Sequence, residues 1–233
     1  RLQRFVIQEA DELAGWKIVM PSNALDAYGL MLSAIVDPNP VMVLLPKALL
    51  RVRGEQLIPG EPEDQQLLRE MIDAPVKNRE NWQPRWPPLK EYYVPIGRAS
   101  LVRTGDDATI ISYGRTLPLC VEAAKRVEET RGAKCDVIDL RSIFPYDWKA
   151  ISKSVQKTGR VLIVNEDTEV TNFGEHLLRR VIDHHFYDLL VRPRLLAGQH
   201  VPGIGLNQNY EQNTVPQLPS ILRELEALLD EPA

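Results

Sequence analysis

The chain is poor in features that mark several classes of protein. It has two cysteines, Cys120 and Cys135, too few for a disulfide framework or a four-cysteine zinc site, and this usage is typical of a reducing compartment. Positive charge is not in excess, since 28 Lys and Arg stand against 32 Asp and Glu, for a formal net charge of -4. Because nucleic-acid binding depends on a cationic surface, we expect no nucleic-acid partner.

Long apolar runs and phosphate-binding loops are also missing. No stretch approaches the ~20 apolar residues that a membrane-spanning helix needs, so we expect no membrane partner. Gly203 and Gly205 lack the strand–turn–helix context of a dinucleotide loop, and the sequence contains neither a P-loop nor a nucleophile elbow. Residue spacing alone therefore predicts no catalytic apparatus.

What remains is the composition of a folded globular protein. Of the 233 residues, 44% are hydrophobic and 26% are charged, which is enough to form a sizeable core. The chain begins at Arg1 rather than Met, so we treat it as a fragment of a longer protein. We find no signal-peptide pattern in the residues that open this sequence. We expect a cytoplasmic location, and the missing start leaves the mitochondrial matrix open.

Proline is concentrated in one segment. Seven of the 18 prolines fall within residues 51–96, where proline interrupts both helices and sheet ladders. Periodicity is weak there, apart from a short helical pattern over residues 63–71. Trp82 and Trp86 are among four aromatic residues in the segment, more than a free linker carries. We interpret 51–96 as a linker lying against a surface, between a domain of residues 1–50 and a domain of residues 97–233.

Residues 1–50 contain a β-α-β pattern. Residues 16–20 are predicted to form a strand, Asn23 to cap a helix with Asp26 three residues later, and residues 41–45 to form a second strand. Continuous apolar strands around a crossover helix indicate a parallel sheet covered on both faces. Fifty residues are too few to complete such a sheet, so we expect a partial domain.

Residues 97–233 alternate strands and helices more fully. Strands are predicted at residues 108–113, 135–140, 161–164 and 194–197. Helical spacing of apolar residues is found at 120–127, 148–157, 173–189 and 218–228. This alternation predicts an α/β domain with a mostly parallel sheet. Both cysteines lie on apolar faces, where burial as small hydrophobic side chains explains them.

Two features that follow predicted strands are candidates for chemistry. His200 lies in a loop after the last strand, and loops beyond the carboxyl ends of parallel strands are where α/β proteins bind ligands. Residues 165–169 (NEDTE) follow another strand. Their three carboxylates could bind a cation or do acid–base work, although a solvated loop is the simpler interpretation.

The other histidines favour structural roles. His184 and His185 are adjacent on a predicted helix, so their imidazoles point ~100° apart and cannot chelate one ion. His185 falls on the apolar stripe of this helix, which we expect to comprise Leu178, Ile182, His185 and Leu189. His176 lies near the start of the same helix and has no assigned role.

Several short strings together resemble one family. The strings in the first segment are 15–23 (GWKIVMPSN), 26–30 (DAYGL) and 33–40 (SAIVDPNP). They resemble the later part of the pyrimidine-binding domain in E1 β subunits of thiamine-diphosphate-dependent 2-oxo acid dehydrogenases, relatives of transketolase. The strings that resemble the transketolase C-terminal domain are 94–97 (VPIG), 112–114 (SYG), 136–143 (DVIDLRSI), 157–159 (KTG) and 172–174 (NFG). Their order and spacing match across nearly all of residues 15–230, apart from the linker.

The resemblance implies both a fold and an activity. The implied fold is α/β, with a partial β-α-β piece of a pyrimidine-binding fold followed by a transketolase C-terminal-like domain. The family's E1 decarboxylates pyruvate or a branched-chain 2-oxo acid and passes the acyl group to a lipoyl-bearing E2. It uses thiamine diphosphate with Mg²⁺ and an E1 α subunit or α-like half. We expect this chain to supply scaffold, dimer and E2 contacts in a homo- or hetero-oligomer.

The same resemblance implies that the chain is inactive alone. The family's catalytic glutamate, which binds the aminopyrimidine ring, lies in an early part of the domain with no counterpart here. Glu9, Asp11 and Glu12 do not sit in a matching motif, and the diphosphate and Mg²⁺ are held by the partner domain or α subunit. We therefore assign no catalytic or thiamine-binding residue and expect no cofactor on this chain by itself. The alternatives are a non-catalytic assembly module of the same fold and a transketolase-type enzyme fragment.

One site is implied residue by residue. The string that ends the first helix resembles a structural K⁺ site built from backbone carbonyls, and it maps onto Ala34, Ile35, Asp37 and Asn39. The last carbonyls of a helix lack partners and carry partial negative charge, and an ordinary proline-terminated helix end is the alternative. Leu45 departs from the family, which commonly has Glu before Pro-Lys at this point.

Overall fold

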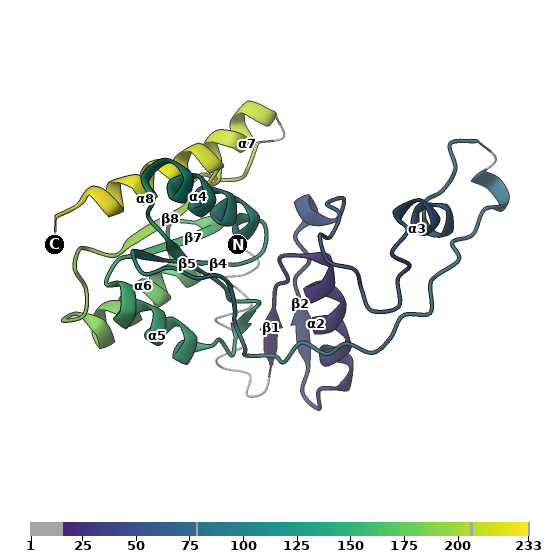
Figure 1. Ribbon diagram of the computed structural model, residues 1–233, viewed down its shortest axis with the longest axis horizontal. Helices are drawn as coiled ribbons and strands as arrows, with labels where there is room; N and C mark the ends of the chain where they lie inside the picture. The colour runs from purple at the N-terminus through teal and green to yellow at the C-terminus, as the bar shows by residue number, and fades with distance from the viewer. Residues whose placement is uncertain (1–15, 78, 206, 233) are drawn as a thin grey trace.

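The strands form two sheets, arranged side by side (Figure 1). The computed structural model describes residues 16–77, 79–205 and 207–232. The smaller sheet has the order β2-β1-β6, and the larger sheet has the order β3-β5-β4-β7-β8. The strands are β1 (Lys17–Val19), β2 (Val41–Val43), β3 (Ser100–Arg103), β4 (Ala108–Ser112), β5 (Cys135–Asp139), β6 (Ser142–Phe144), β7 (Val161–Thr168) and β8 (Arg194–Gly198). Residues 1–15 lie outside the described residues. They include Glu9, Asp11 and Glu12 and the first residue of the string 15–23.

The helices alternate with these strands along most of the chain. The α-helices are α2 (Ala24–Val36), α3 (Gln65–Ile72), α4 (Thr116–Arg131), α5 (Trp148–Thr158), α6 (Phe173–His185), α7 (Gln208–Thr214) and α8 (Leu218–Asp230). Two short 3₁₀ helices are η1 (Lys47–Leu49) and η2 (Arg79–Asn81). Within the described ranges, no helix is both long and apolar enough to cross a bilayer.

The smaller sheet contains the predicted β-α-β unit. β1 and β2 pair in parallel, with Ile18 opposite Met42, and α2 connects them. The predicted cap is confirmed, because the Asn23 side chain accepts a hydrogen bond from the Asp26 amide at 2.8 Å. β6 adds to this sheet antiparallel to β1. The sheet is therefore not confined to the first fifty residues.

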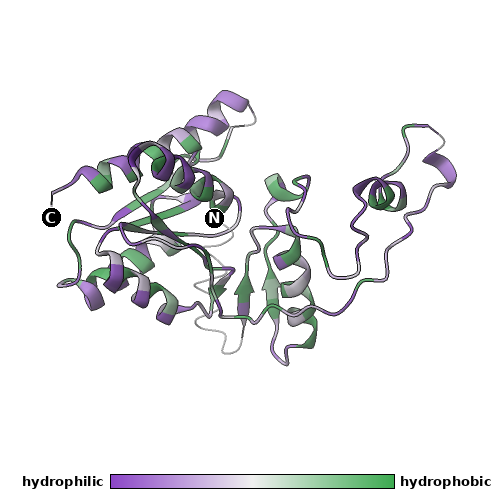
Figure 2. Cartoon of the chain, in the orientation of Figure 1, coloured by the Kyte–Doolittle hydropathy of each residue, from purple (hydrophilic) through white to green (hydrophobic). Residues whose placement is uncertain are grey.

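The larger sheet is mostly parallel, as predicted. β5, β4, β7 and β8 run parallel, and β3 pairs antiparallel with β5 at one edge. Helices α4 and α8 cover one face and α5 and α6 the other (Figure 1). Figure 2 shows hydrophobic residues concentrated on the strands and on the inward sides of these helices. Both cysteines are buried in the core under α4 and α8.

Some predicted boundaries differ from the structure. Three elements were not predicted from the sequence. β3 is a half-exposed edge strand, β6 has only three residues, and none of the residues of α7 is buried. Residues 165–168 (NEDT) belong to β7 rather than to a loop, because β8 pairs with β7 as far as Thr168. α6 ends at His185 rather than Leu189, and its buried face contains Leu177 and Val181. The predicted apolar stripe is therefore off by one residue at Leu178 and Ile182, and Ile182 is exposed.

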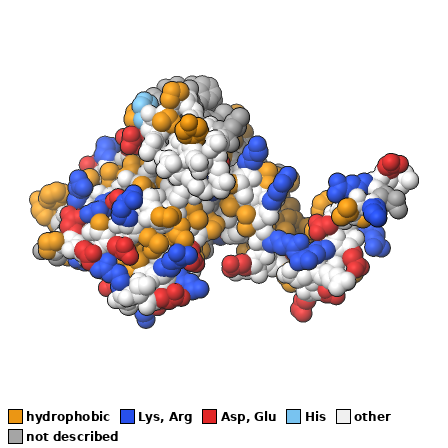
Figure 3. Space-filling view, turned by 90° about the horizontal axis from the view of Figure 1, so that it is seen from above, with side chains coloured by type: hydrophobic (Ala, Val, Ile, Leu, Met, Phe, Trp, Pro, Cys, Tyr) orange, Lys and Arg blue, Asp and Glu red, His pale blue; other side chains and the backbone are white. Residues whose placement is uncertain are grey.

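Residues 51–96 form an arm that leaves the smaller sheet and returns to it. The returning part lies on α2, where the Ser33 hydroxyl donates to the Val94 carbonyl at 2.7 Å and the Tyr28 hydroxyl to the Lys90 carbonyl at 3.0 Å. Farther out, α3 lies away from both sheets and Trp86 is 71% exposed (Figures 1 and 3). Figure 3 shows side chains of both charge signs mixed over the arm. Only part of the arm lies against a surface.

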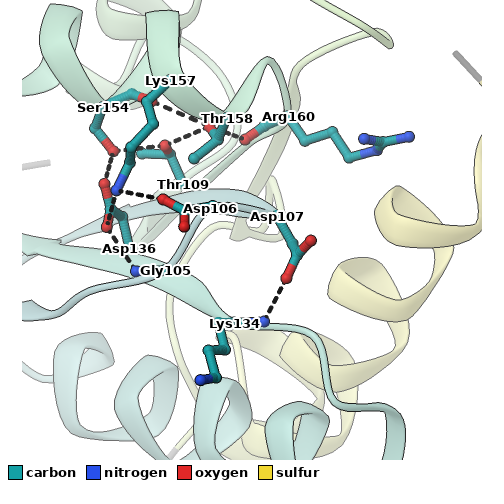
Figure 4. Close-up of polar contacts among 10 residues, drawn as sticks. All are labelled: Gly105, Asp106, Asp107, Thr109, Lys134, Asp136, Ser154, Lys157, Thr158 and Arg160. Atoms are coloured by element: carbon teal, nitrogen blue, oxygen red, sulfur yellow. Dashed lines mark hydrogen bonds and ion pairs between the residues drawn. The ribbon is translucent and has the colours of Figure 1, made fainter.

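The amino end of the larger sheet holds a buried carboxylate (Figure 4). Asp136 is 2% exposed. It accepts hydrogen bonds from the Gly105 amide at 2.9 Å, the Ser154 hydroxyl at 2.6 Å and the Lys157 ammonium at 2.8 Å. The Thr109 hydroxyl lies 2.6 Å from that of Ser154. A buried charge with this many donors is stabilised by them, so the network fastens α5 to the sheet.

We predict that Asp136→Ala lowers the free energy of unfolding by about 3 kcal/mol, because the buried donors of Gly105 and Ser154 and the partly exposed ammonium of Lys157 lose their acceptor. Urea denaturation followed by circular dichroism measures the change. Asp106→Ala is the matched control. Asp106 also contacts Lys157, at 3.4 Å, but its side chain is 87% exposed, so its loss should cost under about 0.5 kcal/mol. Equal effects of the two substitutions would contradict the assignment.

Candidate functional site

The carboxyl end of β1 meets the carboxyl ends of β4 and β5, and we call this meeting point the junction. Ser22, just after β1, donates from its hydroxyl to Asp139 Oδ1 at 2.9 Å and accepts from the Gly114 amide at 2.8 Å. The Met20 amide donates to the Arg141 carbonyl at 2.8 Å. Residues that are far apart in the sequence are thus joined at the edge where parallel sheets bind ligands.

Two residues with positive φ shape the junction. Gly114 has φ +60°, and a Cβ there would lie 2.9 Å from the Met20 side chain. Glycine thus allows the left-handed turn and leaves room for the Met20 side chain. Arg141 has φ +55°, an uncommon conformation for a residue with a Cβ. It occupies the tight connection between β5 and β6.

A half-buried ion pair reinforces the junction. The Arg141 guanidinium contacts Asp26 Oδ1 at 3.0 Å, and the two side chains are 14% and 11% exposed. The other oxygen of Asp26 accepts from the Asn23 amide group at 2.8 Å. Arg141 also donates from Nε to the Arg98 carbonyl at 3.3 Å. Breaking such a pair would leave an uncompensated charge in a low-dielectric region, which is costly.

Asp139 is the most perturbed carboxyl group of the junction. Its side chain is fully buried, and Oδ1 accepts from Ser22 and from the Arg141 amide at 3.1 Å. Oδ2 has no hydrogen-bond partner among the residues that the structure describes. Burial raises the pKa of Asp139 to about 7, the hydrogen bond from Ser22 opposes this rise, and the charge of Asp26 adds to it. The group can therefore gain or lose a proton near neutral pH.

The neighbouring part of this edge contains further buried polar groups. The Tyr113 hydroxyl is buried without a partner in the described part of the chain, and burial raises its pKa well above the usual range. Burial also raises the pKa of Glu166, while Arg115, at 3.8 Å, opposes the rise. Asn165 donates to the Asn172 side chain at 3.0 Å. Residues 165–168 of the predicted acidic loop are thus buried or partly buried strand residues, whereas Glu169 is exposed and follows β7.

The predicted histidine candidates do not join the junction. His200 is exposed, with Nδ1 3.3 Å from the Thr168 hydroxyl. His176 contacts the Tyr146 hydroxyl at 2.7 Å. His184 packs beside the ring of Trp148. His185 is buried, as its place on the stripe predicts, and Nδ1 lies 2.7 Å from Asp188.

The predicted K⁺ ligands lie together at the end of α2. Pro38 and Pro40 have no N–H to give to the carbonyls of Ala34 and Val36, four residues earlier. In a continuing helix the Asn39 amide would donate to the Ile35 carbonyl, but here it donates to Asp37 Oδ1 at 3.0 Å. Lys17 contacts Asp37 Oδ2 at 2.5 Å. The helix end thus has carbonyls without regular helical donors, and an ammonium group already lies beside it.

Residue patterns alone assign no functional role to the residues that build the junction. Ser22, Gly114, Asp139 and Arg141 all fall within the strings that resemble known proteins, and this was the signal that singled them out. Their contacts could not be read from the sequence, because the Ser22–Asp139 bond joins residues 117 positions apart.

Comparisons with known proteins agree with the fold. Residues 97–221 match the family described as transketolase, C-terminal domain. The 2-oxoisovalerate dehydrogenase subunit beta of Bacillus subtilis is 34% identical over 190 residues, covering 82% of this chain and 49% of the relative. The pyruvate dehydrogenase E1 component subunit beta of Rhizobium meliloti is 32% identical over 217 residues, covering 93% of this chain and 40% of the relative.

A solved structure supports the fold alone. A split-gene transketolase, described as an inactive beta4 tetramer, superposes with a TM-score of 0.65 at 17% identity and covers 92% of this chain and 58% of its own. The chain spans about half the length of the curated relatives it matches. Because the family match covers residues 97–221 of 233, the chain belongs to the transketolase C-terminal domain family, and across both of its sheets it is similar to E1 β subunits of 2-oxo acid dehydrogenases.

Proposed function

We propose that this chain is the β-like part of a 2-oxo acid dehydrogenase E1 and that its own contribution is structural. The observation that carries this proposal is the similarity to E1 β subunits, which extends over 93% of the chain in the Rhizobium meliloti relative. In this reaction, pyruvate or a branched-chain 2-oxo acid is oxidatively decarboxylated and the acyl group passes to a lipoyl-bearing E2. The Bacillus subtilis relative is named for 2-oxoisovalerate, a branched-chain 2-oxo acid, and the Rhizobium meliloti relative is named for pyruvate. Each name therefore supports one of the two substrates.

The proposed organisation has three parts. Residues 1–50 would belong to a pyrimidine-binding domain, 51–96 would be the arm, and 97–233 would be the C-terminal domain. The contacts of Ser22 and Arg141 support a role in holding the first and third parts in a fixed relation. We propose that the complete protein assembles with an E1 α subunit or α-like half, with further copies and with E2.

The described residues do not fit thiamine diphosphate with Mg²⁺, so we assign no step of the reaction to them. In the ranges that the structure covers, no group of three or more His, Cys, Asp or Glu side chains is placed to hold a metal ion. At the junction both carboxylate oxygens of Asp26 have partners, and Asp139 is fully buried. We propose that the cofactor is held by other parts of the complete enzyme.

An activity assay of the natural protein that contains this sequence tests the proposal. The protein would be purified with its α-type partner and supplied with thiamine diphosphate, Mg²⁺, a lipoyl-bearing E2 as the acyl acceptor and either pyruvate or 3-methyl-2-oxobutanoate. Release of CO₂ from one of these acids supports the proposal. Transfer of a two-carbon unit between sugar phosphates, or no turnover at all, would instead favour the transketolase-type enzyme or the assembly module.

We predict that the chain alone does not bind thiamine diphosphate in the presence of Mg²⁺, because its described residues offer no site for the diphosphate–metal group. Isothermal titration calorimetry should show only heats of dilution. The complete E1, titrated under the same conditions, is the positive control. Saturable micromolar binding by the chain alone would overturn this prediction.

We also propose that the carbonyls of Ala34, Ile35, Asp37 and Asn39 bind K⁺. Replacing Na⁺ by K⁺ at equal ionic strength should then raise Tm by about 2–4 °C when K⁺ is present at about ten times its Kd. Pro38→Ala is the control variant, because it supplies an N–H to the Ala34 carbonyl and should reduce the K⁺ effect. Equal Tm values in the two salts would count against the site.

A further inference from the structure

We propose that Asp139, Ser22, Asp26 and Arg141 form a proton-operated latch, in which uptake of one proton by Asp139 tightens the junction between the two sheets. This latch does not depend on the proposed E1 function. It is a property of contacts within the chain.

The side-chain contacts of Ser22 and Asp26 join the segment after β1 to the ends of β4 and β5. Ser22 and Asp26 follow β1, whereas Gly114 follows β4, Asp139 ends β5 and Arg141 lies in the connection from β5 to β6. Ser22 lies between the Gly114 amide at 2.8 Å and Asp139 Oδ1 at 2.9 Å. Opening the junction breaks this chain of hydrogen bonds and brings water to Asp139.

Asp139 is an unusual group to place at such a contact. It is fully buried, and its Oδ2 has no partner within the described residues. A charged carboxylate with one bare oxygen in a dry environment is expensive. A neutral carboxylic acid removes that cost, because its proton can sit on Oδ2 while Oδ1 continues to accept from Ser22.

Two charged groups of the described chain face Asp139. Asp26, on α2, disfavours the carboxylate, and Arg141, in the connection from β5 to β6, favours it. Arg141 is already paired with Asp26 at 3.0 Å, so its charge is largely matched before Asp139 ionises. Burial is the largest influence and, with Asp26, it outweighs Arg141 and the hydrogen bond from Ser22.

The sign of the pH effect follows from these two states. In the closed junction the pKa of Asp139 is raised from 3.8 to about 7, and in an open, hydrated junction it returns toward its ordinary value. The closed state therefore binds the proton more tightly. The equilibrium constant for opening the junction is therefore lowest below about pH 4. It rises about tenfold per pH unit between about pH 4 and pH 7 and is constant above pH 7.

Hydrogen exchange of backbone amides in the 233-residue chain tests the latch. The amides of Gly114 and Met20 donate across the junction, and the amide of Thr109, bonded to the Arg160 carbonyl at the far end of the larger sheet, is the internal reference. After correction for intrinsic exchange, the opening constant at Gly114 and Met20 should rise about tenfold per pH unit between pH 5 and 7. It should level off above pH 7, and at each pH the opening constants at Gly114 and Met20 should exceed that of the Thr109 amide, which reports unfolding of the larger sheet.

Two substitutions and one direct titration complete the test. Asp139→Asn, which keeps a neutral group of the same shape, should abolish the pH dependence at the junction. Asp106→Asn, at an exposed carboxylate, should leave the dependence unchanged. If Asp139→Asn fails to fold, the ¹³C shift of the Asp139 carboxyl in the wild-type chain decides, with an expected midpoint near pH 7. A midpoint near pH 4, or equal pH profiles in wild type and Asp139→Asn, would overturn the latch.

Discussion

The structure depends on one bridging hydroxyl group. The Ser22 hydroxyl accepts a hydrogen bond from the Gly114 amide and donates one to Asp139. This arrangement fixes the end of β1 against the larger sheet. The pairing of β6 with β1 continues the same connection. These contacts join the two sheets directly, without passing through the arm of residues 51–96.

The two buried aspartates at opposite ends of β5 illustrate different uses of a carboxylate. Asp136 has three donors spread over both of its oxygens, which is how proteins stabilise a buried charge. Asp139 has donors at one oxygen only. The donors around Asp136 thus stabilise its charge at the amino end of the sheet. At the carboxyl end, Asp139 is the group that we propose changes its charge. In parallel sheets, the carboxyl end is also where function is concentrated.

The sequence predicted the regular core better than the junction. Continuous apolar runs identified β2 and the start of β7, because the strands of a sheet that is covered on both faces are largely apolar. The short strand β6 gave no such signal, since three residues cannot establish a period. The junction could not be derived at all, because it depends on tertiary contacts between loops. Family resemblance marked its residues without revealing what they touch, and it led to K⁺ ligands that stay a prediction.

The arm has a consequence for how the chain can vary. Its return is anchored on α2 at Val94, and its outgoing part passes close to the start of the same helix, where Gly54 approaches Ala24. Both ends of the loop are therefore held by one rigid body. The entropy of closing a flexible loop changes by only about 0.6 kcal/mol when its length doubles. The length of the arm is thus free to vary at little thermodynamic cost, without disturbing either sheet.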